Sequence, residues 1–141
     1  MGQVLDMQFM RYINLFEKIT RVRTSVCFSY NNFIVFGVKK QEVSDAIGKN
    51  ASNVKEIAQV FGKKVKIVGM PKDKTQSDVE EFVSSLIAPA QFNKFEIVNN
   101  EAVLGATMEN KAILIGRNSQ RQKELEEILK RYFDISGVKI I

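Results

Sequence analysis

The sequence predicts an α+β fold built from two similar units that follow one another along the chain. Two observations support this prediction. The 141-residue chain matches itself at an offset of 68 residues, and a self-match at a fixed offset is typical of a duplicated structural unit. In each half, the hydrophobic side chains switch between the spacing of a helix and that of a strand. With 45% apolar and 26% charged residues, the composition is that of a globular protein.

The self-match is gapless and is concentrated around one turn. Residues 31–67 align with residues 99–135, and ten of the 37 positions are identical. The identical pairs are Asn31 and Asn99, Asn32 and Asn100, Val35 and Val103, Gly37 and Gly105, Ile47 and Ile115, Gly48 and Gly116, Asn50 and Asn118, Lys55 and Lys123, Glu56 and Glu124, and Ile67 and Ile135. We therefore expect both copies to contain the same elements in the same order.

The first copy begins with a helix and two strands. Apolar side chains recur every three or four positions over residues 4–19, which predicts an amphipathic helix. Residues 26–30 alternate as in a half-buried strand, and residues 33–38 form a continuous apolar run, as in a buried one. Asn31-Asn32 between them is a turn signal. The first half of the unit is thus helix, strand, turn and strand.

The remainder of the first copy predicts two helices and a strand. Ser44 can cap a short helix that runs to Ile47, and a second helix over residues 54–61 is stopped by Gly62. Residues 64–67 alternate as a strand. The order of elements is therefore helix, strand, strand, short helix, helix, strand.

The second copy repeats this order after a polar linker over residues 70–76. Ser77 and Glu80 predict a capping box at the start of a helix that ends before Pro89. The later predicted elements are strands at 95–97 and 102–106, a short helix at 112–115, a helix at 125–132 and a strand at 135–140. We place the first unit at residues 1–70 and the second at 71–141. Because a core of about 70 residues is marginal alone, we expect the two units to pack together.

Composition excludes several kinds of chemistry. The chain has no histidine and one cysteine, so it has no His-based acid–base catalysis, no internal disulfide and no Cys or His metal cluster. Cys27 should point away from Val26, Phe28 and Tyr30 and be partly exposed; we assign it no role. The net charge is +5, and residues 1–70 supply +6 of it from eleven Lys and Arg against five Asp and Glu. This imbalance favours an anionic partner, although a solvated basic surface is the simpler alternative.

The matched turns carry the most specific chemistry. In each, a glycine ends a short helix, a cation and an asparagine follow, and a long helix begins. Small residues allow a ligand close to the backbone, and the new helix presents free N–H groups and a positive dipole end to an anion. The sequence therefore predicts a phosphate-binding loop in each copy. The two loops are Gly48-Lys49-Asn50-Ala51 and Gly116-Arg117-Asn118-Ser119.

Each copy has two helices between strands, joined by the sequence Ile-Gly, a basic residue, Asn and a small residue. This arrangement resembles the KH domain, whose loop signature is Gly-x-x-Gly. The extra helix and strand before this core resemble the type II arrangement, in which helices cover a three-stranded sheet. Two such units in tandem resemble the short archaeal members of the NusA family. The resemblance adds Lys64 and Lys66, on a strand that borders the base-binding groove in that family. Lys55 and Lys123, on the first turns of the long helices, complete the predicted RNA contacts.

Both loops depart from the signature at its last glycine, which is replaced by Ala51 in the first copy and Ser119 in the second. If this position requires a positive φ, each replacement carries strain of about 1 kcal/mol or more. We expect aspartate at Gly48 or Gly116 to weaken RNA binding without disturbing the fold. We also expect the first loop to contribute more than the second, because acidic residues follow the second loop.

The resemblance implies an RNA-binding protein without catalysis or cofactor that acts in transcription termination or antitermination. Its implied partners are single-stranded RNA and RNA polymerase or another transcription protein, and we expect a cytoplasmic monomer with no membrane contact. A KH protein of RNA processing or ribosome assembly is an alternative of the same class. A different class is a protein–protein adaptor whose altered loops no longer hold RNA. Loss of RNA binding would favour the adaptor.

Overall fold

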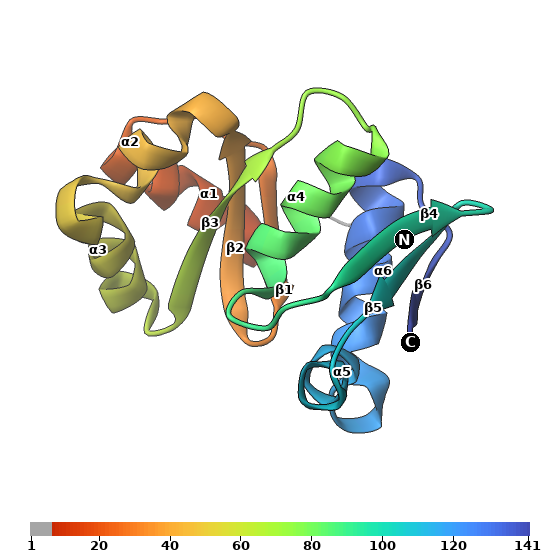
Figure 1. Cartoon of the computed structure of the whole chain (residues 1–141). Coiled ribbons are helices and arrows are strands. Elements are labelled where there is room, and N and C mark those ends of the chain that lie inside the picture. Colours follow the sequence, from red (N-terminus) through yellow and green to blue (C-terminus); the bar gives the residue numbers. More distant parts are fainter. Residues whose placement is uncertain (1–6) are drawn as a thin grey trace. The chain divides into compact units, whose positions relative to one another are not determined.

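The fold is described by a computed structural model of the chain, which covers residues 7–141. The chain divides into two compact units, Met1–Met70 and Pro71–Ile141. Each unit contains one three-stranded sheet flanked by helices (Figure 1). The predicted α+β class, with two units in the order helix, strand, strand, helix, helix, strand, is confirmed. Residues 4–6 of the first predicted helix lie outside the described part.

The first unit contains three α-helices, three strands and two short 3-10 turns within residues 7–70. In chain order they are α1 (Met7–Thr20), β1 (Val26–Tyr30), β2 (Phe33–Lys39), a 3-10 turn (Lys40–Glu42), α2 (Val43–Ile47), a 3-10 turn (Lys49–Ala51), α3 (Ser52–Phe61) and β3 (Lys64–Met70). Ser44 lies inside α2 and does not cap it, because the 3-10 turn starts the helical segment earlier than expected.

The second unit has the same order. Its elements are α4 (Gln76–Ile87), β4 (Lys94–Val98), β5 (Glu101–Gly105), α5 (Met108–Ile115), a 3-10 turn (Arg117–Ser119), α6 (Gln120–Phe133) and β6 (Gly137–Ile140). The capping box of α4 is formed by Thr75 and Asp78 and not by Ser77 and Glu80. Thr75 has the extended backbone of an N-cap, and its hydroxyl accepts the Asp78 N–H at 3.1 Å.

Each sheet begins with a tight hairpin whose turn is the predicted Asn-Asn pair. Asn31 and Asn32 have φ of 53° and 64°, and Asn99 and Asn100 have φ of 51° and 62°. A two-residue hairpin turn with positive φ at both central residues matches the twist of the strands, and asparagine tolerates that conformation better than most residues. The turn prediction is confirmed in both units.

The third strand of each sheet runs parallel to the second. In the first sheet β2 is central, antiparallel to β1 and parallel to β3, with Phe33 opposite Lys64. In the second sheet β5 is central, antiparallel to β4 and parallel to β6, with Glu101 opposite Gly137. A parallel connection needs a crossover, and the two helices between the strands provide it. The loop between those helices leads directly into the N-terminus of the second helix.

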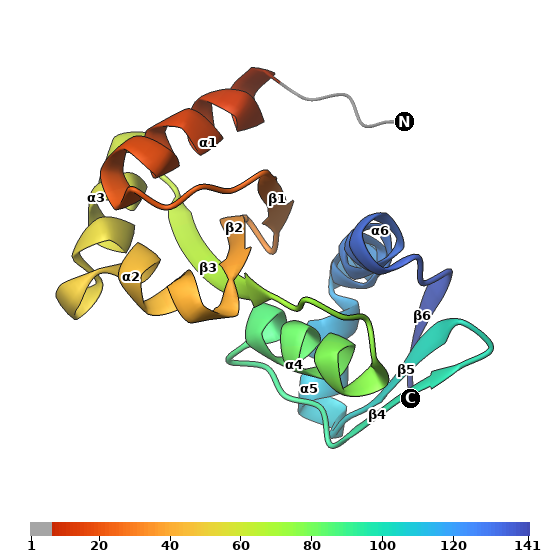
Figure 2. The same cartoon turned by 90° about the horizontal axis from the view of Figure 1, so that it is seen from above.

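The core of the first unit lies between its helices and one face of its sheet (Figure 2). Phe16 of α1 stacks on Phe36 of β2 with ring centroids 4.3 Å apart, and Ile57 of α3 is fully buried beside them. Cys27 belongs to this core and is 6% exposed, so the expected partial exposure is wrong. The alternation of β1 was predicted, but Cys27 lies on the face that the helices cover, opposite Phe36.

The core of the second unit is formed by stripes on α4 and α6. The apolar side chains at helical spacing along α4, which are Val79, Phe82, Val83 and Leu86, are buried. The Phe82 ring lies 4.9 Å from the Phe133 ring of α6, centroid to centroid. Leu125 and Leu129 of α6 are fully buried. The last turn of α6 buries Phe133, whereas Tyr132 is half-buried.

The internal repeat holds through the loop and then breaks. The helical segments 40–47 and 108–115, and the turns Lys49–Ala51 and Arg117–Ser119, correspond at an offset of 68. However, α6 has 14 residues and α3 has 10, one extra turn. Ile67 consequently lies within β3, whereas Ile135 precedes β6. Their identity in the gapless alignment does not reflect structural equivalence.

Candidate nucleic-acid interface

The first loop makes a sharp turn between α2 and α3. Gly48 ends α2 with φ 82° and ψ 164°, and its N–H donates to the Ser44 carbonyl at 3.0 Å. Asn50 and Ala51 follow in the left-handed region, with φ of 57° and 60°. The Ala51 N–H donates to the Gly48 carbonyl at 3.0 Å, which closes the turn. The loop is thus a defined structure that ends at the N-terminus of α3.

The second loop has the same backbone. Gly116 has φ 74° and ψ 172°, and Asn118 and Ser119 have φ of 56° and 60°. The Ser119 N–H donates to the Gly116 carbonyl at 3.1 Å. Every torsion quoted for one loop lies within about ten degrees of its counterpart in the other. The two copies have therefore kept one loop geometry with different side chains.

Gly48 and Gly116 are required by this geometry. A Cβ at Gly48 would lie 2.8 Å from Ser52 Oγ and 3.0 Å from the Asn53 backbone nitrogen. A Cβ at Gly116 would lie 2.7 Å from Cγ and 3.0 Å from the backbone nitrogen of Arg121. Both glycines also have positive φ, where side chains are strained. The expectation that aspartate at these positions leaves the fold undisturbed is wrong, because the helix that follows fills the space.

Ala51 and Ser119 occupy a position that requires a positive φ. Each has φ of 60°, which costs an L-residue with a Cβ roughly 1–2 kcal/mol. Because the position does require a positive φ, both loops are strained where the signature has glycine. The strain lies where the long helix begins.

The polar side chains of the loops face solvent. Lys49, Asn50, Arg117 and Asn118 are exposed. Within residues 7–141, neither Lys49 nor Arg117 forms an ion pair or a side-chain hydrogen bond. A cation without a protein partner beside a helix N-terminus leaves its charge available to an external anion. This is the arrangement that the sequence predicted in both units.

Lys55 and Lys123 are exposed in the first turns of α3 and α6, close behind the two loops. The neighbouring contacts differ between the units. In the first, the Asn53 side chain donates to the Asp45 carbonyl at 3.3 Å and links α3 to α2. In the second, Arg121 stands at the matching position and pairs with Glu124, so its charge is already balanced.

Lys64 and Lys66 are not brought together with the first loop. Their ammonium groups lie 5.7 and 5.3 Å from the ring centroid of Phe33, on the sheet face opposite the helices. Burial lowers the pKa of Lys66. Lys64 starts β3 just beyond the C-terminal end of α3, and the ten residues of α3 span about 15 Å. The two lysines therefore lie together over Phe33, on the sheet face opposite the helices.

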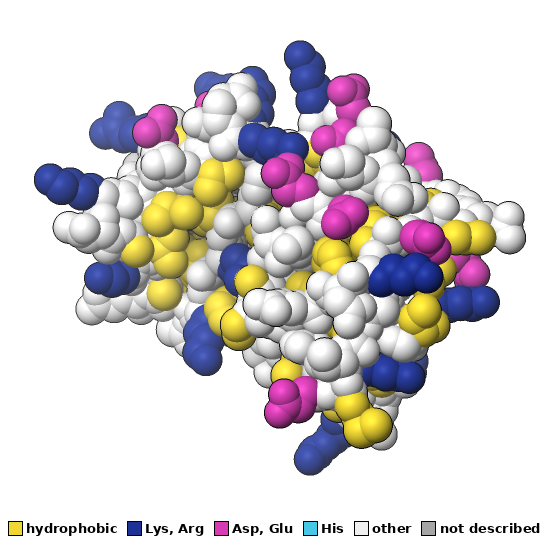
Figure 3. Space-filling view, in the orientation of Figure 1, with side chains coloured by type: hydrophobic (Ala, Val, Ile, Leu, Met, Phe, Trp, Pro, Cys, Tyr) yellow, Lys and Arg dark blue, Asp and Glu magenta, His cyan; other side chains and the backbone are white. Residues whose placement is uncertain are grey.

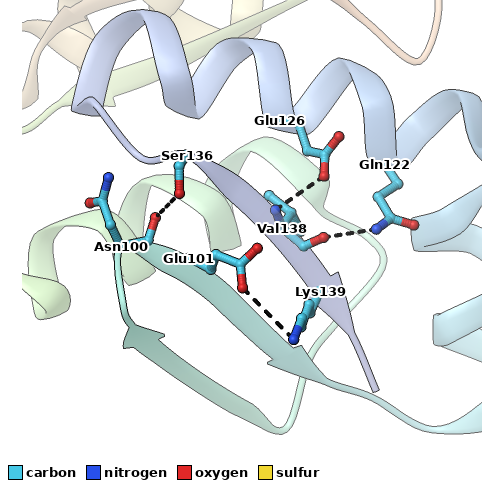
Figure 4. Close-up of polar contacts among 7 residues, drawn as sticks. All are labelled: Asn100, Glu101, Gln122, Glu126, Ser136, Val138 and Lys139. Atoms are coloured by element: carbon cyan, nitrogen blue, oxygen red, sulfur yellow. Dashed lines mark hydrogen bonds and ion pairs between the residues drawn. The ribbon is translucent and has the colours of Figure 1, made fainter.

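Two residues that sequence reasoning missed lie at the edge of the second sheet. The Gln122 side chain donates to the Val138 carbonyl at 2.8 Å, and the Glu126 carboxylate accepts the Val138 N–H at 3.2 Å (Figure 4). Both side chains project from α6 onto β6. The sequence offers one indication of them. Aligned at the offset of 68, α6 has polar Gln122 and Glu126 where α3 has apolar Val54 and Ala58.

A hydrophobic patch is visible where α3 and β3 lie side by side, with Lys and Arg side chains around it (Figure 3). Half-buried apolar side chains of this region include Val54, Ala58 and Phe61 of α3. A nucleobase has an apolar face and a polar edge, and its phosphate is anionic. Apolar surface beside basic side chains is therefore chemically suited to single-stranded nucleic acid.

Other chemistry finds little support in the described residues. Residues 7–141 hold no cluster of three or more His, Cys, Asp or Glu able to bind a metal ion. Burial raises the pKa of the Cys27 thiol to about 12, so this cysteine is protonated and unreactive at neutral pH. In the same residues no helix is both long and apolar enough to cross a membrane.

No protein-family model matches the chain. One solved structure, the crystal structure of APE1850, superposes with a TM-score of 0.67 and covers 97% of this chain and 100% of its own, at 24% sequence identity. At that identity the likeness concerns the fold. It extends over both units, so the whole architecture occurs in another protein.

Curated relatives give a more specific result. A probable transcription termination protein NusA from Methanocaldococcus jannaschii is 30% identical over 133 residues, which is 92% of this chain and 70% of the relative. A protein of the same name from Halococcus morrhuae is 26% identical over 134 residues, 93% of each chain. Another, from Thermoplasma acidophilum, is 22% identical over 140 residues, 96% of this chain and 94% of the relative. The chain therefore belongs to the archaeal NusA-like family.

Proposed function

We propose that this protein binds single-stranded RNA through two type II KH domains, residues 1–70 and 71–141, and acts in transcription termination or antitermination. The observation that carries the proposal is the shared backbone of the two loops, each with an unpaired cation at the start of a long helix. Glycine allows the close approach, the helix N-terminus favours the anion, and Lys49 or Arg117 adds a charge.

The role in transcription rests on the relatives, which are named as probable transcription termination proteins. On this proposal the protein is a non-enzymatic cytoplasmic monomer whose partners are RNA and RNA polymerase or another transcription protein. An RNA-processing or ribosome-assembly protein would use the same loops, and the transcript bound in cells would distinguish it.

The experiment is a fluorescence titration of a labelled single-stranded RNA at two salt concentrations. Each phosphate contact should contribute about −0.7 to the slope of log affinity against log salt, so contacts at both loops predict a slope steeper than about −1.4. A duplex of equal length is the control and should bind more weakly. Equal binding of duplex and single strand would contradict the KH proposal.

A second candidate is a protein–protein adaptor. The observation that favours it is the strained replacement of the signature glycine by Ala51 and Ser119, together with the Arg121–Glu124 pair beside the second loop. If the folded protein binds neither single-stranded nor duplex RNA at low salt, the adaptor replaces the RNA-binding proposal.

A further inference from the structure

The edge of the second sheet is closed by the unit's own side chains. β6 is an edge strand, and an edge strand presents backbone N–H and C=O groups that lack a neighbouring strand. At Val138 both groups are already used: the carbonyl accepts from Gln122 at 2.8 Å and the N–H donates to Glu126 at 3.2 Å (Figure 4). One donor and one acceptor from α6 therefore already bind the backbone groups with which a ligand would otherwise form hydrogen bonds.

In the first unit the corresponding residue is Val65, which is 8% exposed. Val65 pairs with Ile34 in the parallel ladder as Val138 pairs with Ala102, and Ile34 corresponds to Ala102 in the repeat. The backbone groups of Val65 therefore point outward from the sheet as those of Val138 do. Within residues 7–141, no side chain forms a hydrogen bond with the Val65 backbone.

The facing helix explains the difference. At the offset of 68, Gln122 and Glu126 correspond to Val54 and Ala58 of α3, and the two loops start both helices with the same geometry. Val54 and Ala58 are half-buried and apolar, so they cannot reach out to a strand backbone with a hydrogen bond. They offer instead an apolar surface beside the N–H and C=O groups of Val65, which have no side-chain partner.

A nucleobase has the chemistry to bind the apolar surface of Val54 and Ala58 and the backbone groups of Val65. Its ring face can lie on apolar side chains, and its polar edge carries neighbouring donors and acceptors. Val54 is the third residue of α3, so a base there would follow a phosphate held at Lys49. In the second unit the Glu126 carboxylate fills the edge and repels the phosphate chain.

We propose that Gln122 and Glu126 close the β6 edge to nucleobases, so that the first unit alone reads bases, through Val65, while the second unit holds only phosphate. This inference rests on the proposed RNA binding. It assigns to Gln122 and Glu126 a role in specificity: they keep the second unit indifferent to RNA sequence.

The test monitors backbone amide signals by NMR during titration of the intact chain with a mixed-sequence eight-nucleotide RNA. A matched abasic oligonucleotide, which has the same phosphates without bases, is the second probe. We expect the Val65 amide to shift with the RNA and not with the abasic strand, and the Val138 amide to shift with neither. A Val138 shift that requires bases would overturn the inference while leaving RNA binding intact.

Exchanged residues provide the matched variants. Gln122→Val with Glu126→Ala should make the Val138 amide respond to RNA. Val54→Gln with Ala58→Glu should reduce affinity for RNA about tenfold, toward that for the abasic strand, because one stacked base is lost. Dispersed amide spectra confirm folding. Unchanged affinity in a folded Val54→Gln, Ala58→Glu variant would also overturn the inference, and no binding by the intact chain would remove it together with the proposed function.

Discussion

The two loops share one backbone but lead into helices of different charge. Lys55 has the counterpart Lys123, and Glu56 has the counterpart Glu124. The first turn of α6 adds Arg121 in place of Asn53, and Arg121 pairs with Glu124. One turn later the first unit has Ala58 and Gln59 where the second has Glu126 and Glu127. Glu126 lies seven residues beyond Ser119, about 10 Å along the helix, which is close to the Debye length at physiological salt.

The expected asymmetry between the loops does not depend on Lys64 and Lys66. Lys64 and Lys66 come after the first loop in the sequence but lie over Phe33, on the sheet face opposite the helices. The stronger contribution expected from the first loop therefore rests on the missing acidic turn and the strand edge at Val65.

The largest expected effect concerns the loop glycines. Gly48→Ala should lower the free energy of unfolding by about 2 kcal/mol, because the Cβ meets the Asn53 backbone and the backbone is glycine-like. Gly116→Ala should cost as much. Gly62→Ala is the control: its φ is 66° but no atom lies within 4 Å of its Cβ, so about 1 kcal/mol is expected. Urea unfolding measures all three, and equal losses at Gly48 and Gly62 would argue against the close packing of the loop.

A pH effect should distinguish the two sheets, because Cys27 is matched by Phe95 in the second. Burial raises the thiol pKa from 9.0 to about 12. Between these values the unfolded chain loses the proton and the folded chain keeps it, so stability falls as pH rises, by up to about 1.4 kcal/mol per pH unit. Cys27→Ala removes this term. The stability difference between the two proteins should shrink from pH 8.5 to 10.5, whereas parallel curves would contradict a buried thiol.

A smaller effect should come from relieving the loop strain. Ala51→Gly and Ser119→Gly should each raise the free energy of unfolding by about 0.5–1 kcal/mol, since glycine removes the left-handed penalty but loses chain entropy. Ala58→Gly, inside α3, should instead lower it by about 1 kcal/mol. Thermal unfolding measures the three variants. Destabilisation by Ala51→Gly would show that its Cβ contributes packing that outweighs the strain.

Local patterns made much of the fold predictable. The Asn31-Asn32 turn, the α4 stripe and the glycine stops depend on neighbouring residues, and the sequence contains those directly. The loops were predictable because their chemistry is repeated at a fixed offset. Alternation along β1 was also visible and led to Cys27 being placed on an exposed side. However, residues on both faces of this strand are buried, with Cys27, Phe28 and Tyr30 at 6%, 3% and 6% exposure.

The closed edge of the second sheet was not predictable from the repeat. The gapless alignment pairs β3 with residues that precede β6, because α6 is one turn longer than α3. Only the strand register shows that Val138, and not Phe133, corresponds to Val65. The hydrogen bonds of Gln122 and Glu126 depend on that register. A tertiary contact between a helix and a strand edge leaves no periodic signal in either segment.

The most direct test of the account compares charge reversal in the two loops. Lys49→Asp and Arg117→Asp place a carboxylate where each loop is proposed to hold phosphate, at exposed positions that leave the glycines unchanged. Single-stranded RNA affinity should fall roughly tenfold or more for Lys49→Asp and only a few-fold for Arg117→Asp, and each should make the salt slope about 0.7 less steep. Circular dichroism melts confirm folding. Equal losses would contradict the asymmetry between the units, and no loss from either folded variant would contradict RNA binding at the loops.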